Sequence, residues 1–180
     1  MILIISTCHE KLSEEEFVMP IAEIVKSAGK DITIKHYKEA KLAETNKAEK
    51  IIICGTALQD NEYLKQLDKF SWLKKAKKPV LGICSGMQIL ALQNSAKLTE
   101  NQEIGRTKIR VKKANILFQK DFDAYELHAN GLENLKEFEI LAESYSGTQA
   151  IKLKSKEQYG IMFHPEVRNE NIVRNFLSLT

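Results

Sequence analysis

A buried strand that runs directly into a turn, with a glycine on either side of a cysteine, constrains this fold more than any other feature. Residues 80–83 are mostly apolar, Cys84 lies between Gly82 and Gly86, and a helix with apolar spacing begins at once. A strand, a sharp turn and a helix in this register form the thiol version of the nucleophile elbow. Because glycines permit close approach of neighbouring backbone, we expect the Cys84 sulfur to project beyond the edge of a sheet.

The helix that follows would give this cysteine a reactive setting. Its N-terminus points at the sulfur and favours the thiolate over the thiol. The backbone N–H of Ser85 then faces the place where an oxyanion would form during acyl transfer. The alternative interpretation is a buried structural cysteine between two packing glycines. The agreement of strand, glycines and helix start favours the nucleophile.

The rest of the chain predicts an α/β protein. In the first half, short β-branched runs alternate with longer segments of helical spacing, which is typical of parallel strands covered on both faces by helices. After about Thr107 the pattern changes to closely spaced strands. We therefore expect an open, mostly parallel sheet flanked by helices, with added antiparallel strands in the second half. The expected strands are 2–6, 32–34, 51–54, 80–83, 109–111, 116–118, 124–127, 139–143, 150–153 and 160–163, and the expected helices are 13–28, 62–77, one that begins at 87, and 171–177.

The first helix has clear end signals. Ser13 followed three residues later by Glu16 predicts a capping box, in which each side chain bonds the backbone N–H of the other residue. Gly29 is expected to end the helix, since glycine readily adopts the left-handed conformation at that position.

Composition indicates the class of protein. The chain has 180 residues, an apolar fraction of 43% and a net charge of +3, which suits a single folded domain over residues 1–180. Its 27 basic residues comprise 23 Lys and 4 Arg. Because arginine is the residue favoured for forked contacts with bases and phosphates, we expect no nucleic-acid partner. The Lys-rich run at 74–78 is interpreted as a solvated helix end.

Hydropathy and cysteine usage indicate the compartment. No apolar run approaches the roughly 20 residues that a membrane helix needs, so we expect no membrane partner. The apolar start at 2–6 is too short for a signal peptide and reads as a strand. Three cysteines without framework spacing are typical of free thiols in a reducing cytosol, and we expect a cytoplasmic protein.

A cysteine nucleophile needs a base, and the base needs a group that orients it. Among the four histidines, His164 directly follows an apolar strand, which places it at the edge where the carboxyl ends of parallel strands gather. Glu166, two residues later, is within reach of the second imidazole nitrogen, and Pro165 stiffens the turn between them. The sequence thus predicts a triad of Cys84, His164 and Glu166.

These motifs resemble those of the class I (triad) glutamine amidotransferases. The elbow at 82–88 matches the family pattern Gly-x-Cys-x-Gly-x-Gln, and residues 163–166 match Phe-His-Pro-Glu. Residues 127–132 are similar to the family segment Ser-His-x-Asp-x-Val, residues 138–144 to the strand that follows it, and residues 175–177 to the closing helix. The resemblance covers the chain from about Ile51 to the end.

The resemblance implies hydrolysis of L-glutamine through a thioester on Cys84, with no cofactor and no metal. It implies that Gln88 and Gly55 bind the glutamine substrate. It also implies an oxyanion hole made of backbone N–H groups, from Ser85 on one side and from the position of Thr56 on the other.

Some residues depart from the family pattern. Thr56 replaces the second glycine of a Gly-Gly-Pro turn, and its β-branched side chain resists a positive φ, so a peptide flip that aims an N–H at the oxyanion would be harder. The histidine common after the elbow is Met87, which is interpreted as core filler. The first loop carries Cys8 and His9 instead of the Gly- and Gln-rich loop of many relatives.

Residues 103–109 are similar to the corresponding segment of the stand-alone amidotransferase subunit of archaeal GMP synthase. That subfamily implies a partner chain, an ATP-dependent synthetase that adenylates xanthosine monophosphate (XMP) and receives the ammonia. It also implies low glutaminase activity until the partner docks, because docking would shift the population towards the competent oxyanion geometry.

Three other hypotheses stay open at this point. Cys8, Cys54 and Cys84 each follow a predicted strand, so with His9 and His164 they could form a metal or redox cluster. A second hypothesis is a non-catalytic regulatory or binding subunit whose oxyanion hole is altered at Thr56. A third is a γ-glutamyl hydrolase that works without any synthetase.

Overall fold

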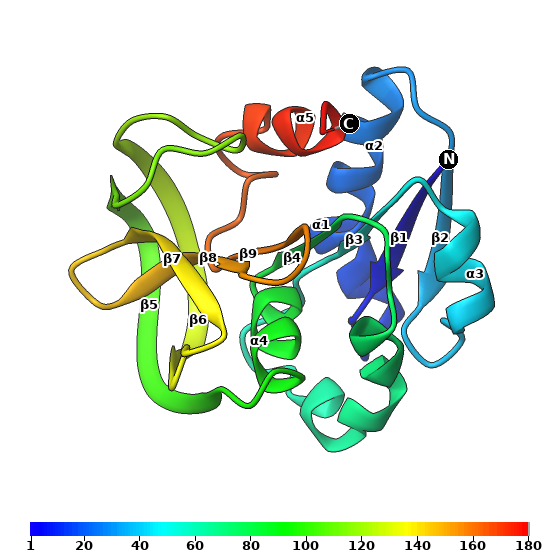
Figure 1. Cartoon of the computed structure of the whole chain (residues 1–180), viewed down its shortest axis with the longest axis horizontal. Helices are drawn as coiled ribbons and strands as arrows, with labels where there is room; N and C mark the ends of the chain where they lie inside the picture. The colour runs from blue at the N-terminus through cyan, green and yellow to red at the C-terminus, as the bar shows by residue number, and fades with distance from the viewer. Residues whose placement is uncertain (180) are drawn as a thin grey trace.

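The computed structural model describes residues 1–179, which form one nine-stranded sheet. Its strand order is β2-β1-β3-β4-β9-β8-β7-β5-β6 (Figure 1). The first five strands in this order are parallel and the remaining pairs are antiparallel. The expected fold class is therefore confirmed. The strands are β1 (Ile2–Ser6), β2 (Ile32–His36), β3 (Lys50–Ile53), β4 (Val80–Ile83), β5 (Lys97–Val111), β6 (Phe122–Glu133), β7 (Phe138–Glu143), β8 (Thr148–Leu153) and β9 (Gln158–Ile161).

Helices cover both faces of the parallel strands. They are η1 (Lys11–Ser13), α1 (Glu14–Phe17), α2 (Met19–Ser27), α3 (Leu42–Lys47), η2 (Glu62–Lys74), α4 (Ser85–Leu92) and α5 (Asn171–Leu177). None of the helices within residues 1–179 is both long and apolar enough to cross a membrane.

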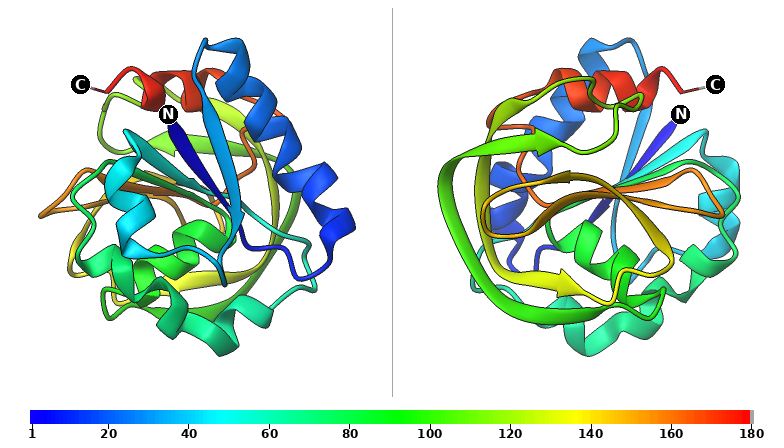
Figure 2. Two further views of the ribbon diagram at one scale, coloured as in Figure 1. Left: turned by 90° about the vertical axis from the view of Figure 1, so that its right-hand side faces the viewer. Right: turned by 60° about the vertical axis from the view of Figure 1, so that its left-hand side comes forward.

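Strand β1 shows how the core divides into two layers. Its Ile2 and Ile4 pack with α2 and α5, whereas Leu3 and Ile5 pack with η2 and α4 on the opposite face. Successive strand residues point to opposite faces, so a strand covered on both sides must be apolar throughout. Figure 2 shows the long strands β5 and β6 curving around the end of the sheet.

The first helix does not begin as the capping box predicts. Ser13 has helical dihedrals (φ −65°, ψ −18°) and makes no capping hydrogen bond, because it already belongs to the 3₁₀ turn η1. The chain becomes α-helical at Glu14 and starts a second helix at Met19. The other end signal is confirmed, because Gly29 has φ +74° directly after α2.

Four further points of the sequence prediction need correction. The segment predicted as a helix over 62–77 is a 3₁₀ helix that ends at Lys74 and is kinked at Gln66. Residues 116–118 form no strand, because the Asn115 side chain accepts a bond from Leu117 N at 2.9 Å and holds a turn. Helix α3 was not expected, and β5 is much longer than the predicted 109–111.

The parallel strands bring their following residues to one edge of the sheet. Strand β1 leads into Thr7 and Cys8, β3 into Cys54, β4 into Cys84, and β9 into the segment that ends at His164. In a parallel sheet this carboxyl edge is where ligand sites form.

Candidate active site

Cys84 lies in a strained turn between β4 and α4. Its backbone has φ 50° and ψ −106°, a conformation that costs about 1–3 kcal/mol for a residue with a side chain. The turn is crowded by neighbouring backbone: a Cβ on Gly82 would lie 2.4 Å from the Gly86 oxygen, and one on Gly86 would lie 2.4 Å from the Ile53 oxygen. Both glycines are therefore needed for the elbow, as the sequence predicts.

The elbow is held from both sides. Cys84 N donates to the Ile161 oxygen at 2.8 Å, which extends the pairing of β4 with β9. The Cys84 sulfur lies 3.6 Å from the Leu127 oxygen of β6. Behind the turn, Met87 is fully buried, and a Cβ on Gly160 would lie 2.7 Å from its Cγ. Met87 is thus core filler, as expected.

His164 and Glu166 form a buried pair. The His164 backbone N–H donates to the Tyr125 oxygen at 2.9 Å, and its Nδ1 bonds Oε1 of Glu166 at 2.7 Å. The two side chains are only 1% and 3% exposed. Nε2 of His164 has no hydrogen-bond partner and is buried, so this nitrogen is free to exchange protons with a reacting group.

Gly55 packs against both His164 and Cys84, and there is no room for a side chain at this position. A Cβ on Gly55 would lie 2.8 Å from Cε1 of His164 and 3.3 Å from Cβ of Cys84. The loop after β3 therefore packs directly over both side chains. Gly55 acts as a close-packed cover here, and it does not line the pocket described below.

The pKa of His164 is set by opposing effects. Burial lowers it, whereas the neighbouring negative charges of Cys84 and Glu166 and the hydrogen bond to Glu166 raise it. The pKa of His164 lies well above the ordinary 6.5. This direction favours the protonated form of the imidazole.

A small pocket opens beside the cysteine. Four of the predicted site residues line it, namely Thr56, Cys84, Ser85 and Gln88, whereas His164 and Glu166 do not. Its walls come from the loop after β3, from the start of η2, from the Cys84 turn with α4, and from β6. The lining residues are Thr56, Ala57, Leu58, Asp60, Asn61, Tyr63, Cys84, Ser85, Gln88, Leu127, His128, Ala129 and Asn130.

Gln88 is fixed within this pocket by the protein itself. Its Oε1 accepts a bond from the Tyr63 hydroxyl at 2.5 Å, and its Nε2 donates to the Asn130 oxygen at 3.2 Å. Sequence reasoning missed Tyr63, because a tyrosine in a helix with apolar spacing gives no sign of its hydroxyl partner. Asn130 lies within the segment that resembles the family motif, but no role was expected for it.

Ser85 connects the ends of three strands. Its hydroxyl lies 2.8 Å from the Thr7 hydroxyl and 3.2 Å from the Cys54 oxygen. Thr7 also donates to the Cys54 oxygen at 3.0 Å. As the first residue of α4, Ser85 has a backbone N–H without an acceptor inside the helix, and this N–H is available to a ligand.

The Thr56 side chain is hydrogen-bonded to Asp60 and makes no hydrogen bond to Cys84. Its hydroxyl donates to Oδ2 of Asp60 at 2.6 Å, and the same oxygen accepts the His9 backbone N–H at 2.7 Å. Within residues 1–179, neither Gly55 nor Thr56 is among the residues with positive φ. The backbone at Thr56 has therefore not made the peptide flip to positive φ, as expected for a β-branched residue. Asp60, which holds it there, was not singled out in the sequence.

The remaining cysteines do not form the metal or redox cluster considered above. Cys8 and Cys54 are buried and free, and burial raises the pKa of both thiols. The Cys8 sulfur contacts the Gly55 oxygen at 3.7 Å. Within residues 1–179, the one group of His, Cys, Asp or Glu ligands close enough to share a metal lies elsewhere, at β5 and β6.

The family profile "Glutamine amidotransferase class-I" matches residues 13–178. The chain belongs to the class I glutamine amidotransferase family. The resemblance inferred from its motifs is therefore confirmed.

Several relatives of this amidotransferase carry names from GMP synthesis. A glutamine-hydrolyzing GMP synthase subunit of Methanocaldococcus jannaschii is 39% identical over 112 residues, covering 56% of this chain and 60% of that protein. The GMP synthase of Aquifex aeolicus is 36% identical over 110 residues, covering 55% of this chain and 22% of that protein. The match with the archaeal relative thus spans about 60% of that relative's length.

Solved structures show the same fold. A Thermoplasma acidophilum protein, provisionally described as one of the subunits of GMP synthase, superposes with a TM-score of 0.85 at 25% identity, covering 98% of this chain and 92% of that one. A glutamine amidotransferase from Thermotoga maritima superposes with a TM-score of 0.71 at 17% identity, covering 92% of this chain and 76% of that one.

Proposed function

We propose that this amidotransferase hydrolyses L-glutamine to glutamate and ammonia with Cys84 as nucleophile, His164 as acid and base, and Glu166 as the group that orients the imidazole. One observation carries the proposal. His164 is bonded to Glu166 at 2.7 Å through Nδ1, while Nε2 is unpartnered beside the strained Cys84 turn. Family membership supports the same assignment.

The chemistry proceeds in two halves. In the first, the Cys84 sulfur attacks the side-chain amide carbon of glutamine and forms a C–S bond. The C–N bond then breaks as His164 gives its Nε2 proton to the leaving nitrogen, which departs as ammonia. In the second, His164 removes a proton from water, the water oxygen attacks the thioester carbon, and glutamate leaves as the C–S bond breaks.

The negative oxygen formed in each half needs hydrogen-bond donors. The Ser85 backbone N–H is one such donor, because it begins helix α4 directly after the nucleophile. The second donor belongs to the loop at Thr56, which the bond to Asp60 holds in an unflipped backbone. This restraint favours a low basal rate that rises once the loop is released.

We further propose that the ammonia passes to an ATP-dependent synthetase that activates XMP, so that the pair makes GMP. The names of the relatives support this branch, since relatives named as glutamine-hydrolyzing GMP synthase subunits share up to 40% identity with this chain over about 110 residues. Free cysteines suit the cytoplasm as the compartment, because thiols stay reduced there.

Glutamate release from glutamine tests the proposal, measured on wild type and Cys84→Ala with and without an XMP-activating synthetase. Release that requires Cys84 and rises at least about tenfold with the synthetase is expected. Activity that ignores the synthetase would instead indicate a partner-independent γ-glutamyl hydrolase.

An electrophilic glutamine analogue supplies the control. We expect it to label Cys84 and to leave Cys8 and Cys54 unmodified, because burial keeps those two thiols protonated. Absence of turnover in every condition, together with an unlabelled Cys84, would indicate a non-catalytic binding subunit.

A further inference from the structure

A second group of ionisable side chains lies on the paired strands β5 and β6, next to the pocket. Glu103 of β5 pairs in register with His128 of β6, next to an irregularity of the β5 ladder. Glu126 lies two residues before His128, so both side chains point to the same face of the strand. Nδ1 of His128 and Oε2 of Glu126 are 3.0 Å apart. One donor atom from each of the three residues lies within 4.8 Å of the others.

Two of these residues are completely enclosed. The side chains of Glu126 and His128 are 0% and 1% exposed. Oε1 of Glu126 has no hydrogen-bond partner, and Oε2 of Glu126 and Nδ1 of His128 face only each other, without good hydrogen-bond geometry. Buried polar atoms are normally satisfied, and leaving them unpaired is costly. The enclosed atoms therefore point to a missing partner.

The charges in this group are also unbalanced. Within residues 1–179, no lysine or arginine makes an ion pair with Glu103 or Glu126. One imidazole faces two carboxylates, so at most one of the two negative charges is neutralised. A buried carboxylate without a counter-charge is strongly unfavourable unless it is protonated or coordinates a cation.

Hydrogen bonds from neighbouring side chains fix the orientation of the Glu103 carboxylate, as outer-shell groups do for carboxylate ligands in metal sites. Its Oε2 accepts bonds from Gln149 at 3.0 Å and Ser144 at 3.2 Å, and also from the Ser146 hydroxyl. Its Oε1 accepts only the Thr107 hydroxyl, at 2.6 Å. Such outer hydrogen bonds orient a ligand, and one lone pair of Oε1 is left unused.

We propose that Glu103, Glu126 and His128 bind one divalent transition-metal ion of the Zn²⁺ type. Imidazole nitrogen with carboxylate oxygen is a donor set that Zn²⁺ accepts. Metal bonds of about 2.1 Å place donor atoms about 3–4 Å apart. Nδ1 of His128 and Oε2 of Glu126 are 3.0 Å apart, and the donor atoms of the three residues all lie within 4.8 Å of one another. The proposal does not depend on the glutaminase reaction.

The site has an entry and an open position. Glu103 is half-buried, and His128 lines the same pocket as Cys84. Three protein ligands leave a fourth tetrahedral position for water or another small ligand. Sequence reasoning gave no sign of this site, because its ligands are 23 and 25 residues apart along the chain (126 − 103 and 128 − 103) and meet only through strand pairing.

Zinc binding tests the proposal on full-length protein carrying Cys84→Ser, which removes the pocket thiol as a competing ligand. After chelator treatment, isothermal titration with Zn²⁺ should give one ion per chain. Adding Glu126→Gln or His128→Asn should weaken binding by at least about 100-fold, the upper end of what loss of an outer-shell group costs. Glu133→Gln, an exposed carboxylate at the end of β6, is the matched control and should bind as its parent does.

Two further measurements keep the result decisive. Thermal melting without metal shows whether each variant folds, and Glu126→Gln preserves side-chain shape. Co²⁺ bound to wild-type protein should give a d–d absorption without the intense thiolate-to-cobalt band. A thiolate band that disappears in Cys84→Ser, no Zn²⁺ uptake, or equal affinity in Glu126→Gln and its parent would each overturn the proposal. If the protein takes up no Zn²⁺, or if Glu126→Gln binds it as its parent does, the charge of the buried Glu126–His128 pair is balanced by a proton on Glu126 instead.

Discussion

At the scale of single residues, the molecule contains two imidazole–carboxylate pairs in which the partners are two positions apart. His164 and Glu166 are bonded through Nδ1, and the other imidazole nitrogen is free beside Cys84. His128 and Glu126 face each other at 3.0 Å, but the atoms between them are not satisfied. The first pair has the geometry of a base with its orienting group, and the second has that of an incomplete ligand set.

The charge state of His164 gives a prediction at this scale. Its pKa is lowered by burial but raised more by Cys84 and Glu166, to well above 6.5. Glu166→Gln removes one of the raising charges, so the pKa of His164 should fall and glutamate release should drop by about 10²-fold or more. Titration of the His164 ring protons by NMR and steady-state kinetics measure the two effects.

The sign of the stability effect follows from linkage. A histidine whose folded pKa is raised contributes stability that is complete below 6.5 and is lost as pH rises through the folded pKa. Wild type should therefore lose free energy of unfolding above pH 6.5, and Glu166→Gln should lose less. Glu170→Gln, an exposed carboxylate nearby, should behave as wild type. A His164 that titrates near 6.5 in both proteins would contradict this account.

At the scale of elements, the loop between β3 and η2 decides how ready the site is. Its start covers His164 and Cys84 with Gly55, and its end carries Asp60, which bonds Thr56 and the His9 backbone. A single carboxylate thus connects the loop after β3 with the loop after β1. Movement of either loop is therefore coupled to the backbone at Thr56.

Replacing the branched residue should release this loop. Thr56→Gly removes both the bond to Asp60 and the resistance to a positive φ, so basal glutamate release should rise about tenfold. The rise should stay below the 10²–10³-fold that one oxyanion donor is worth. Initial rates without a synthetase measure the effect, with Thr33→Gly on the edge strand β2 as control. An unchanged or lower rate in Thr56→Gly would show that the threonine does not restrain the loop.

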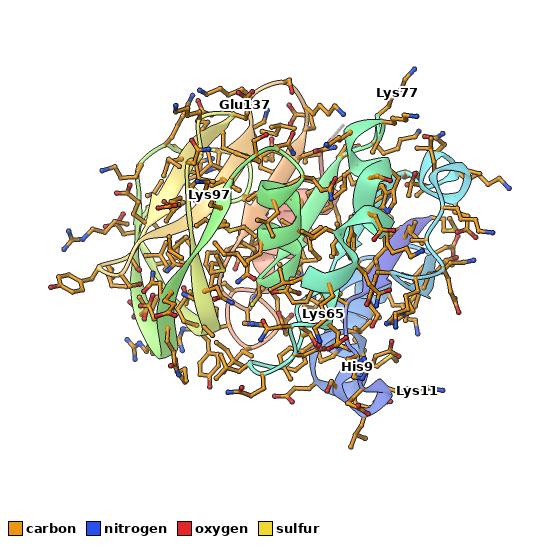
Figure 3. All side chains as sticks on the ribbon, turned by 90° about the horizontal axis from the view of Figure 1, so that it is seen from below. His9, Lys11, Lys65, Lys77, Lys97 and Glu137 are labelled. Atoms are coloured by element: carbon orange, nitrogen blue, oxygen red, sulfur yellow. The ribbon has the colours of Figure 1, made fainter. Side chains whose placement is uncertain are left out.

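At the scale of the whole molecule, the pocket opens beside a larger surface hollow. Ala57, Asp60 and Asn61 line both, so the pocket beside Cys84 adjoins this hollow. His9 and Lys65 also line it, and Figure 3 shows them near each other and far from Lys77. Lys77 precedes strand β4, whereas Cys84 follows it, so the Lys-rich run at 74–78 lies at the opposite end of the sheet.

This placement predicts where a synthetase docks. Lys65→Glu should weaken the apparent affinity for the synthetase by about tenfold at low salt, because charges beside an interface steer association. Lys77→Glu makes the same charge change at the far end and should have no effect. The measurement is the synthetase concentration that gives half-maximal glutamate release. Equal effects of the two variants would place the interface elsewhere.

The amino-acid sequence was sufficient wherever a local rule sets the outcome. The apolar strands, the paired glycines around Cys84 and the short spacing from His164 to Glu166 depend on neighbours in the chain, and they predicted the α/β sheet, the elbow and the buried pair. The single continuous sheet of residues 1–179 also supports the expected single domain, which stays a prediction. The Ser13 capping box was also a local signal, yet it is wrong because the preceding residues already turn as 3₁₀ helix.

Only the tertiary structure decided which distant residues meet. Tyr63 reaches Gln88, Asp60 reaches Thr56 and His9, and Glu103 reaches His128, in each case through the packing of separate elements. Side chains of this kind carry no periodic signal, because a polar residue at a loop or on a strand looks the same in the sequence whether it faces water or a partner. Their roles arise from the register of β5 against β6 and from loops that converge at one sheet edge.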